Sequence, residues 1–128
     1  MTPEQILSIE PKVLTQQQRE VYFENGYILL EKVLSEDWLG RLQKVTMEMV
    51  EKSRSITQSD EKWDLEPGHS AEAPRLRRLS CPNDHHVVYW EFASQSIVPD
   101  IVADLVGPNV KFHHSKLNFK WARGGEEV

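Results

Sequence analysis

The chain has 128 residues, which is enough for a single domain with a modest hydrophobic core. Its formal net charge of −5 argues against general nucleic-acid binding, and its longest apolar runs are too short to cross a bilayer. A single cysteine, Cys81, excludes an internal disulfide, and the N-terminus lacks the features of a secretory signal. We therefore expect a cytoplasmic protein that binds neither nucleic acid nor membrane. Its oligomeric state does not follow from the sequence.

The N-terminal part of the chain predicts an arm, a helix and a strand. Residues 1–14 carry only a short apolar stripe and predict a loosely docked arm. Thr15 and Gln18 then have the spacing of a capping box, and Gly26 is typical of the residue just past a helix end. Residues 27–33 begin with aromatic and branched aliphatic side chains, which predicts a strand.

The clearest secondary-structure signal starts at Ser35, a capping residue followed by two acidic residues. Apolar residues at three- and four-residue spacing then predict a helix with one buried face to about Ser53. The face consists of Trp38, Leu39, Leu42, Val45, Met49 and Val50. The polar stretch 54–74 that follows is long for a connection inside a domain. We interpret it as a candidate lid loop over a substrate.

Three arginines, Arg75, Arg77 and Arg78, lie within four positions. Weak alternation over residues 75–79 predicts a short strand, with Arg75 and Arg77 on one side and Leu76 and Arg78 on the other. Judged from the residues alone, a solvated basic edge is the favoured interpretation of this cluster, and a functional role stays open.

Two further helices precede the last strand candidate. One begins at Asp84, and another opens at Pro99, whose missing N–H would have no partner in a first helical turn. Gly107 ends the second helix. Residues 109–121 then form the best strand candidate of the chain, and residues 123–125 predict a hairpin turn followed by the start of another strand.

The apolar side chains of the strand candidate change face partway along. Val110 and Phe112 mark one face, whereas Leu117, Phe119 and Trp121 mark the other. Two interpretations remain open. Either the polar continuation of the first face forms the wall of a small-molecule site, or a β-bulge shifts the register and the polar residues face water. The polar continuation consists of His114, Lys116, Asn118 and Lys120.

Complete catalytic or metal-binding motifs are absent from the sequence. A catalytic metal site needs about three protein ligands, but no His-x-Asp, His-Glu-x-x-His or Cys-x-x-Cys occurs. Gly-x-Ser-x-Gly, P-loop and Gly-x-Gly-x-x-Gly motifs are missing as well, and Cys81 has no activating neighbours. We therefore assign no catalytic and no metal-ligating residue within the chain. No metal-ligating role is therefore assigned to the five histidines, His69, His85, His86, His113 and His114.

Two blocks of the sequence resemble the phytanoyl-CoA dioxygenase family. The first runs from Leu14 to Asp37 and includes Glu-Asn-Gly-Tyr at residues 24–27. The second, residues 105–125, begins with Leu-Val-Gly-Pro-Asn, contains His-Ser-Lys-Leu-Asn-Phe-Lys and ends with Gly-Gly, which is similar to the central block of the family. The resemblance covers nearly the whole chain from Leu14 onward and is weakest over residues 54–73.

The resemblance implies an α+β architecture, in which residues 15–128 form the N-terminal half of a double-stranded β-helix (jelly roll) with flanking helices. It further implies a dioxygenase that uses Fe(II) and 2-oxoglutarate to hydroxylate a small organic molecule. In this family a His-x-Asp pair and a distal histidine hold the iron. The resemblance places those ligands beyond Val128, so that this chain alone would be inactive.

Two residues are implied as cofactor-binding contacts for 2-oxoglutarate, Lys116 on the last strand and Arg78 in the basic cluster, with Arg75 and Arg77 as alternatives to Arg78. Cations suit the two carboxylates of 2-oxoglutarate because they form charge-assisted hydrogen bonds. A hypothesis from another class is a non-catalytic binding or interaction module that keeps the scaffold without the iron ligands. The substrate itself does not follow from the sequence.

Overall fold

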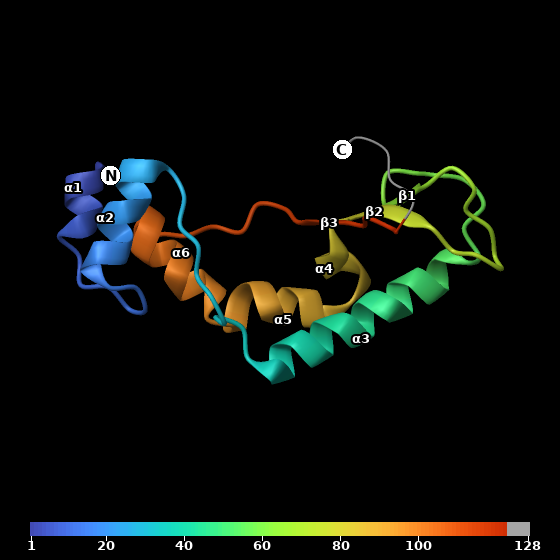
Figure 1. Cartoon of the computed structure of the whole chain (residues 1–128), viewed down its shortest axis with the longest axis horizontal. Helices are drawn as coiled ribbons and strands as arrows, with labels where there is room; N and C mark the ends of the chain where they lie inside the picture. The colour runs from blue at the N-terminus through green and yellow to red at the C-terminus, as the bar shows by residue number, and fades with distance from the viewer. Residues whose placement is uncertain (123–128) are drawn as a thin grey trace. The chain divides into compact units, whose positions relative to one another are not determined.

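A computed structural model of the protein describes residues 1–122 (Figure 1). The described chain is α+β, with a three-stranded antiparallel sheet in the order β1-β2-β3. The elements are α1 (Pro3–Leu7), α2 (Gln16–Asn25), α3 (Glu36–Ser53), β1 (Trp63–Leu65), β2 (Leu76–Ser80), α4 (Pro82–His85), α5 (Val87–Gln95), α6 (Val98–Val106) and β3 (Lys116–Asn118). Within residues 1–122, no helix is both long and apolar enough to cross a membrane. The jelly-roll architecture stays a prediction.

The chain divides into two compact units. The helical unit comprises Met1–Trp38 and Glu91–Phe112, and the sheet unit comprises Leu39–Trp90 and the chain from His113 onward. A helix can bury one apolar stripe and a sheet one apolar face, so helices packed on each other and helices packed on a sheet form two separate sets of contacts.

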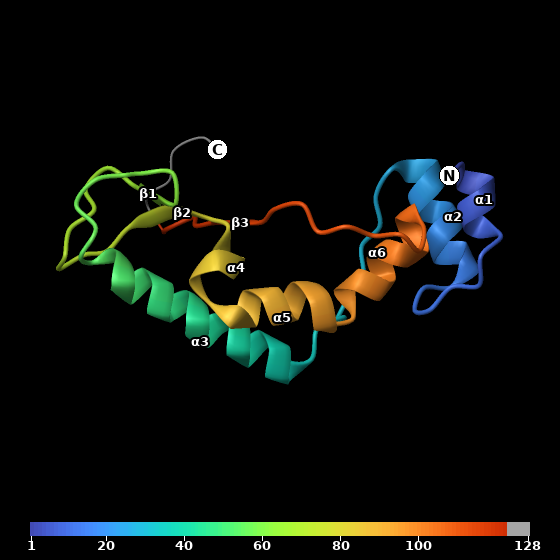
Figure 2. The same ribbon diagram turned by 180° about the vertical axis from the view of Figure 1, so that it is seen from behind.

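In the helical unit, α1, α2 and α6 lie side by side, as both views show (Figures 1 and 2). The predicted capping box is confirmed, since the Thr15 side chain accepts from the Gln18 backbone N–H and the Gln18 side chain accepts from Thr15. Gly26 ends α2 with a φ of 79°, a left-handed conformation that glycine adopts without strain. The helix predicted to open at Pro99 is also confirmed as α6.

The N-terminal arm is held more firmly than the sequence predicted. The buried carboxylate of Asp104 on α6 accepts backbone N–H groups from Lys12, Val13 and Leu14 at 2.8–2.9 Å. Burial alone would raise the pKa of Asp104, but these three hydrogen bonds and the nearby Arg19 guanidinium lower it below its ordinary value. The carboxylate therefore stays ionised and fixes the arm to α6.

A second buried polar group reinforces this attachment. The Arg19 side chain is 1% exposed and donates to backbone carbonyl oxygens of both the arm and α6. Its acceptors are the carbonyls of Ile6, Ile9 and Asp104, together with the Gln16 side chain. A guanidinium group offers five N–H donors in a planar fork, which suits several acceptors at once. We call Asp104, Arg19 and their partners the polar clamp.

The strand predicted at residues 27–33 is wrong. This segment is irregular and turns at Glu31-Lys32, where Lys32 adopts a φ of 53°. No strand among residues 1–122 pairs with it, and Tyr27 and Leu29 are exposed. Branched and aromatic side chains favour a strand only where a neighbouring strand accepts its backbone hydrogen bonds.

The sheet unit is built on an apolar core. Met49 of α3 and Leu76 and Leu79 of β2 are completely buried. They pack with Val45 of α3 and Tyr89 of α5, and the half-buried Leu117 of β3 packs against this cluster. The predicted helix starting after Ser35 is confirmed with its last residue at Ser53. Its predicted face is buried at Val45, Met49 and Val50 but not in the first turns, where Trp38 and Leu42 are half-buried and Leu39 is 43% exposed. The helix predicted from Asp84 is divided into α4 and α5 by the extended backbone of His86.

The last strand is shorter than predicted, because β3 spans only Lys116–Asn118 of the 109–121 stretch. Val110 and Phe112 are exposed rather than directed into a core. The core side of β3 is instead marked by Leu117, which is followed by the half-buried Phe119. The hairpin turn predicted at residues 123–125 and the strand after it lie outside the described residues.

Candidate functional site

The candidate site is the face of the sheet opposite the apolar core. Leu79 pairs with Trp63 on β1 and with Leu117 on β3, and these side chains pack on the core. Arg78 pairs with Asp64 and Asn118, and Ser80 pairs with Lys116. Paired residues on neighbouring strands lie on the same face of the sheet, and successive residues of a strand alternate between the two faces. The side chains next to Leu79 therefore lie together on the other face, and they are polar. We call it the polar face: Asp64, Arg77, Arg78, Ser80, Lys116 and Asn118.

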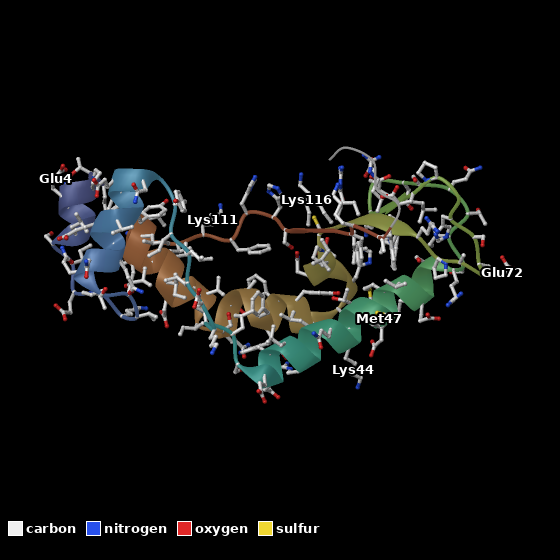
Figure 3. All side chains as sticks on the ribbon, in the orientation of Figure 1. Glu4, Lys44, Met47, Glu72, Lys111 and Lys116 are labelled. Atoms are coloured by element: carbon white, nitrogen blue, oxygen red, sulfur yellow. The ribbon has the colours of Figure 1, made fainter. Side chains whose placement is uncertain are left out.

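This register brings together the two residues implied as 2-oxoglutarate contacts. Arg78 and Lys116 are far apart in the sequence, yet they lie on adjacent strands and on the same face. Figure 3 shows Lys116 pointing away from α3, whereas Lys44 and Met47 point away from the opposite side of that helix. Lys116 and Asn118 are exposed, and Arg78 is half-buried. No further observation tests their role, which stays a prediction.

A β-bulge in β2 explains how two consecutive arginines reach one face. The pairing skips Arg77, since Asp64 pairs with Arg78 and Leu65 pairs with Leu76. The Asp64 carboxylate oxygen Oδ2 lies 4.0 Å from Nε of Arg77 and 3.9 Å from Nη2 of Arg78. The predicted alternation, with Arg77 and Arg78 on opposite sides, is therefore wrong, because the extra residue of the bulge turns both toward Asp64.

The polar face carries more positive than negative charge. Two arginines and Lys116 lie there with a single carboxylate, Asp64, whose distances to the guanidinium groups are long for hydrogen bonds. Nε of Arg78 is buried and has no hydrogen-bond partner among the described residues. Together with the Asn118 amide and the Ser80 hydroxyl, these groups fit a small dicarboxylate, whose oxygens would accept hydrogen bonds.

The histidines are dispersed in the described structure. His69 contacts the backbone of Ser53 and Arg75, on either side of its loop. His85 packs edge-on against Trp63, and His86 lies 3.9 Å from Glu48. His113 and His114 contact each other and are exposed. Burial first, and the charge of Lys62 second, lower the pKa of His85. Within residues 1–122, no three His, Cys, Asp or Glu side chains come together as metal ligands would.

The predicted lid loop, residues 54–74, contains β1 and an internal set of hydrogen bonds. The Arg54 guanidinium donates to the carbonyls of Ala71 and Glu72, and the Asp60 carboxylate accepts from the backbone of Trp63. Its function as a lid stays a prediction. Sequence analysis missed β1 and with it Asp64, although the apolar-polar-apolar order of Trp63, Asp64 and Leu65 is the alternation of a half-buried strand.

Comparison with known proteins finds one distant similarity. The chain is distantly similar to an alpha-ketoglutarate-dependent dioxygenase, alpha-ketoglutarate being another name for 2-oxoglutarate. The relative is a protein of Stutzerimonas stutzeri described as a probable alpha-ketoglutarate-dependent hypophosphite dioxygenase. The two are 22% identical over 108 residues, which are 84% of this chain and 37% of the relative. The chain thus spans little more than a third of that relative's length. A scan against protein families finds no match.

Proposed function

We propose that this chain is part of an Fe(II)- and 2-oxoglutarate-dependent dioxygenase of the phytanoyl-CoA dioxygenase kind, which hydroxylates a small organic substrate. The observation that carries the proposal is the shared face of Arg78 and Lys116. The distant similarity to an alpha-ketoglutarate-dependent dioxygenase supports it independently. In this proposal the sheet is one wall of a jelly roll, and the polar face is directed toward the cosubstrate.

The residues of the polar face would bind and orient 2-oxoglutarate. Lys116 and Arg78 would each hold a carboxylate by charge-assisted hydrogen bonds, which are about twice as strong as neutral ones. Asp64 would keep the guanidinium of Arg78 in place, since its Oδ2 is the nearest acidic oxygen at 3.9 Å. Iron would supply the oxygen chemistry when bound. In this proposal its ligands belong to a part of the protein that the chain does not include.

A binding experiment tests the role of the polar face. Titration of the chain with 2-oxoglutarate, followed by ¹H–¹⁵N NMR, should shift the amide resonances of β2 and β3. Because two cations meet two carboxylates, acetate should bind more weakly than 2-oxoglutarate. Lys116→Met should weaken 2-oxoglutarate binding about tenfold, the effect of losing one charge-assisted hydrogen bond. Lys44→Met removes the same charge from the far side of α3 and should leave binding unchanged.

Two outcomes would contradict this role. One is the absence of shifts on β2 and β3 at saturating 2-oxoglutarate, and the other is equal loss of affinity in Lys44→Met and Lys116→Met. For the catalytic part of the proposal, the measurement is 2-oxoglutarate decarboxylation by the intact gene product supplied with Fe(II). Binding of 2-oxoglutarate without any turnover would favour the non-catalytic module instead.

A further inference from the structure

A polar hollow lies beside β1 in the sheet unit. Its volume is about 330 Å³, and its walls come from three short stretches of the chain. These are residues 57–59, the segment 65–69 that starts at the last residue of β1, and the bulge residue Arg77 of β2. The lining consists of Thr57, Gln58, Ser59, Leu65, Glu66, Pro67, Gly68, His69 and Arg77. The volume is that of a ligand of a few heavy atoms with room for accompanying water.

Glu66 is the unusual group of this hollow. The residue is 7% exposed, and its carboxylate oxygen Oε1 is buried without a hydrogen-bond partner among the described residues. Its backbone is fixed on both sides, since its N–H donates to the Arg75 carbonyl at 2.8 Å and its own carbonyl accepts from His69 N–H at 3.1 Å. A buried, unpaired carboxylate oxygen costs free energy, and a rigid backbone prevents it from swinging out to water.

His69 does not supply the missing donor. Its Nε2 lies 3.0 Å from the Ser53 carbonyl and 3.1 Å from the Ile56 carbonyl, so this nitrogen carries a proton that is already shared. Its Nδ1 accepts the Arg75 backbone N–H at 2.8 Å and therefore carries no proton. The imidazole is thus neutral and serves as a fixed wall. The Arg77 guanidinium, the one cation among the described lining residues, has Asp64 at 4.0 Å outside the hollow.

The buried carboxylate of Glu66 favours a hydrogen-bond donor with positive charge in this hollow. A metal ion would need further carboxylate or imidazole ligands, and no such trio occurs within residues 1–122. An ammonium group needs only hydrogen-bond acceptors, one for each N–H. The Glu66 carboxylate provides the charged acceptor, and the Thr57 hydroxyl and the Gln58 amide carbonyl provide neutral ones.

We propose that this hollow is a binding site for a small primary amine, whose ammonium group donates to the buried carboxylate of Glu66. The ammonium group pairs with the side of this carboxylate that borders the hollow, while the hydroxyl and amide groups of residues 57–59 contact the remainder of the ligand. The proposal is independent of the oxygenase assignment, because it requires neither iron nor 2-oxoglutarate. Failure of 2-oxoglutarate to bind would leave it unaffected.

The test uses the whole chain and three probes: ethanolamine, its uncharged analogue ethylene glycol, and Mg²⁺. We expect ethanolamine to shift the ¹H–¹⁵N resonances of Ser59 and Gly68 saturably, whereas ethylene glycol and Mg²⁺ leave them unchanged. Glu66→Gln keeps the shape of the side chain and removes its charge, so ethanolamine should bind at least about tenfold more weakly. Glu61→Gln makes the same change at an exposed position of the same loop and should not alter binding.

A second variant keeps the test decisive if Glu66→Gln fails to fold. Thr57 is exposed at the edge of the hollow, and Thr57→Phe should fill it and abolish the shifts without touching the core. The proposal is overturned if ethanolamine gives no saturable shifts in the wild-type chain. Equal affinity in Glu66→Gln and Glu61→Gln, or equal shifts with Mg²⁺, would overturn it as well.

Discussion

The two units are stabilised by different physical means. In the helical unit, a buried carboxylate and a buried guanidinium tie the N-terminal arm to α6 through hydrogen bonds to the backbone. In the sheet unit, Met49, Leu76 and Leu79 form a dry apolar core beneath β2. Apolar burial is non-directional and roughly proportional to area, whereas each hydrogen bond of a buried polar group has a defined partner.

This difference bears on where a ligand site can form. The polar clamp of the helical unit uses its charged groups internally, since the Asp104 carboxylate and the Arg19 guanidinium each make several hydrogen bonds within the chain. In the sheet unit, the apolar core packs against one face of the sheet. Its polar face and the hollow at Glu66 therefore retain groups whose hydrogen-bonding capacity is not used within the described chain.

The largest expected effect is on the apolar core of the sheet unit. Met49→Ala should lower the free energy of unfolding of this unit by about 2–5 kcal/mol, because it removes a fully buried side chain and leaves a cavity. Met47→Ala on the same helix is the matched control. Met47 is 57% exposed, so the loss should stay below about 0.5 kcal/mol. Urea unfolding of both variants measures the difference, and equal losses would contradict the assignment of the core.

The next effect should come from the polar clamp. Asp104→Asn leaves one carbonyl oxygen for the three backbone N–H groups that the carboxylate now satisfies, and should destabilise the helical unit by about 2–3 kcal/mol. Amide hydrogen exchange at Leu14 should accelerate, while exchange in β2 stays unchanged. Asp100→Asn is the matched control, because Asp100 pairs with the exposed Lys12 in an ion pair whose loss should have little effect.

The clamp also predicts a dependence on pH. The pKa of Asp104 is lower in the folded chain than in the unfolded one, so the folded state favours the ionised carboxylate. The stabilisation is present above the unfolded value of about 3.9 and is lost as the pH falls through the folded pKa. The difference in stability between the wild-type chain and Asp104→Asn should therefore shrink between neutral pH and about pH 3. A constant difference over this range would contradict the role of the charge.

The smallest expected effect concerns the loop that carries the hollow. His69→Ala removes the acceptor for the Arg75 N–H and the donor to the Ser53 and Ile56 carbonyls, which should cost about 1–2 kcal/mol. Limited proteolysis within residues 54–74 should become faster in this variant. His114→Ala, at an exposed position, should leave the cleavage rate unchanged. Unchanged cleavage in His69→Ala would show that the loop is fixed by other contacts.

Local sequence signals predicted the helices of this chain well but the strands poorly. Thr15, Gln18 and Gly26 act within one or two turns of α2, so their spacing alone locates that helix. A strand depends on a partner that is distant in the sequence. Residues 27–33 have strand-like composition without a partner, whereas the unremarkable Trp63–Leu65 forms β1 because β2 lies beside it.

The same contrast between local signals and long-range contacts holds for the candidate site. Arg78 and Lys116 were singled out by a resemblance in sequence, and their chemistry as cations is a property of the residue types alone. Only the tertiary structure decided that they share a face, because the register of β2 against β3 determines which side chains lie together. The bulge at Arg77 likewise depends on long-range contacts that no local pattern encodes. The same holds for Asp104, which binds the backbone of the arm some 90 residues away in the sequence.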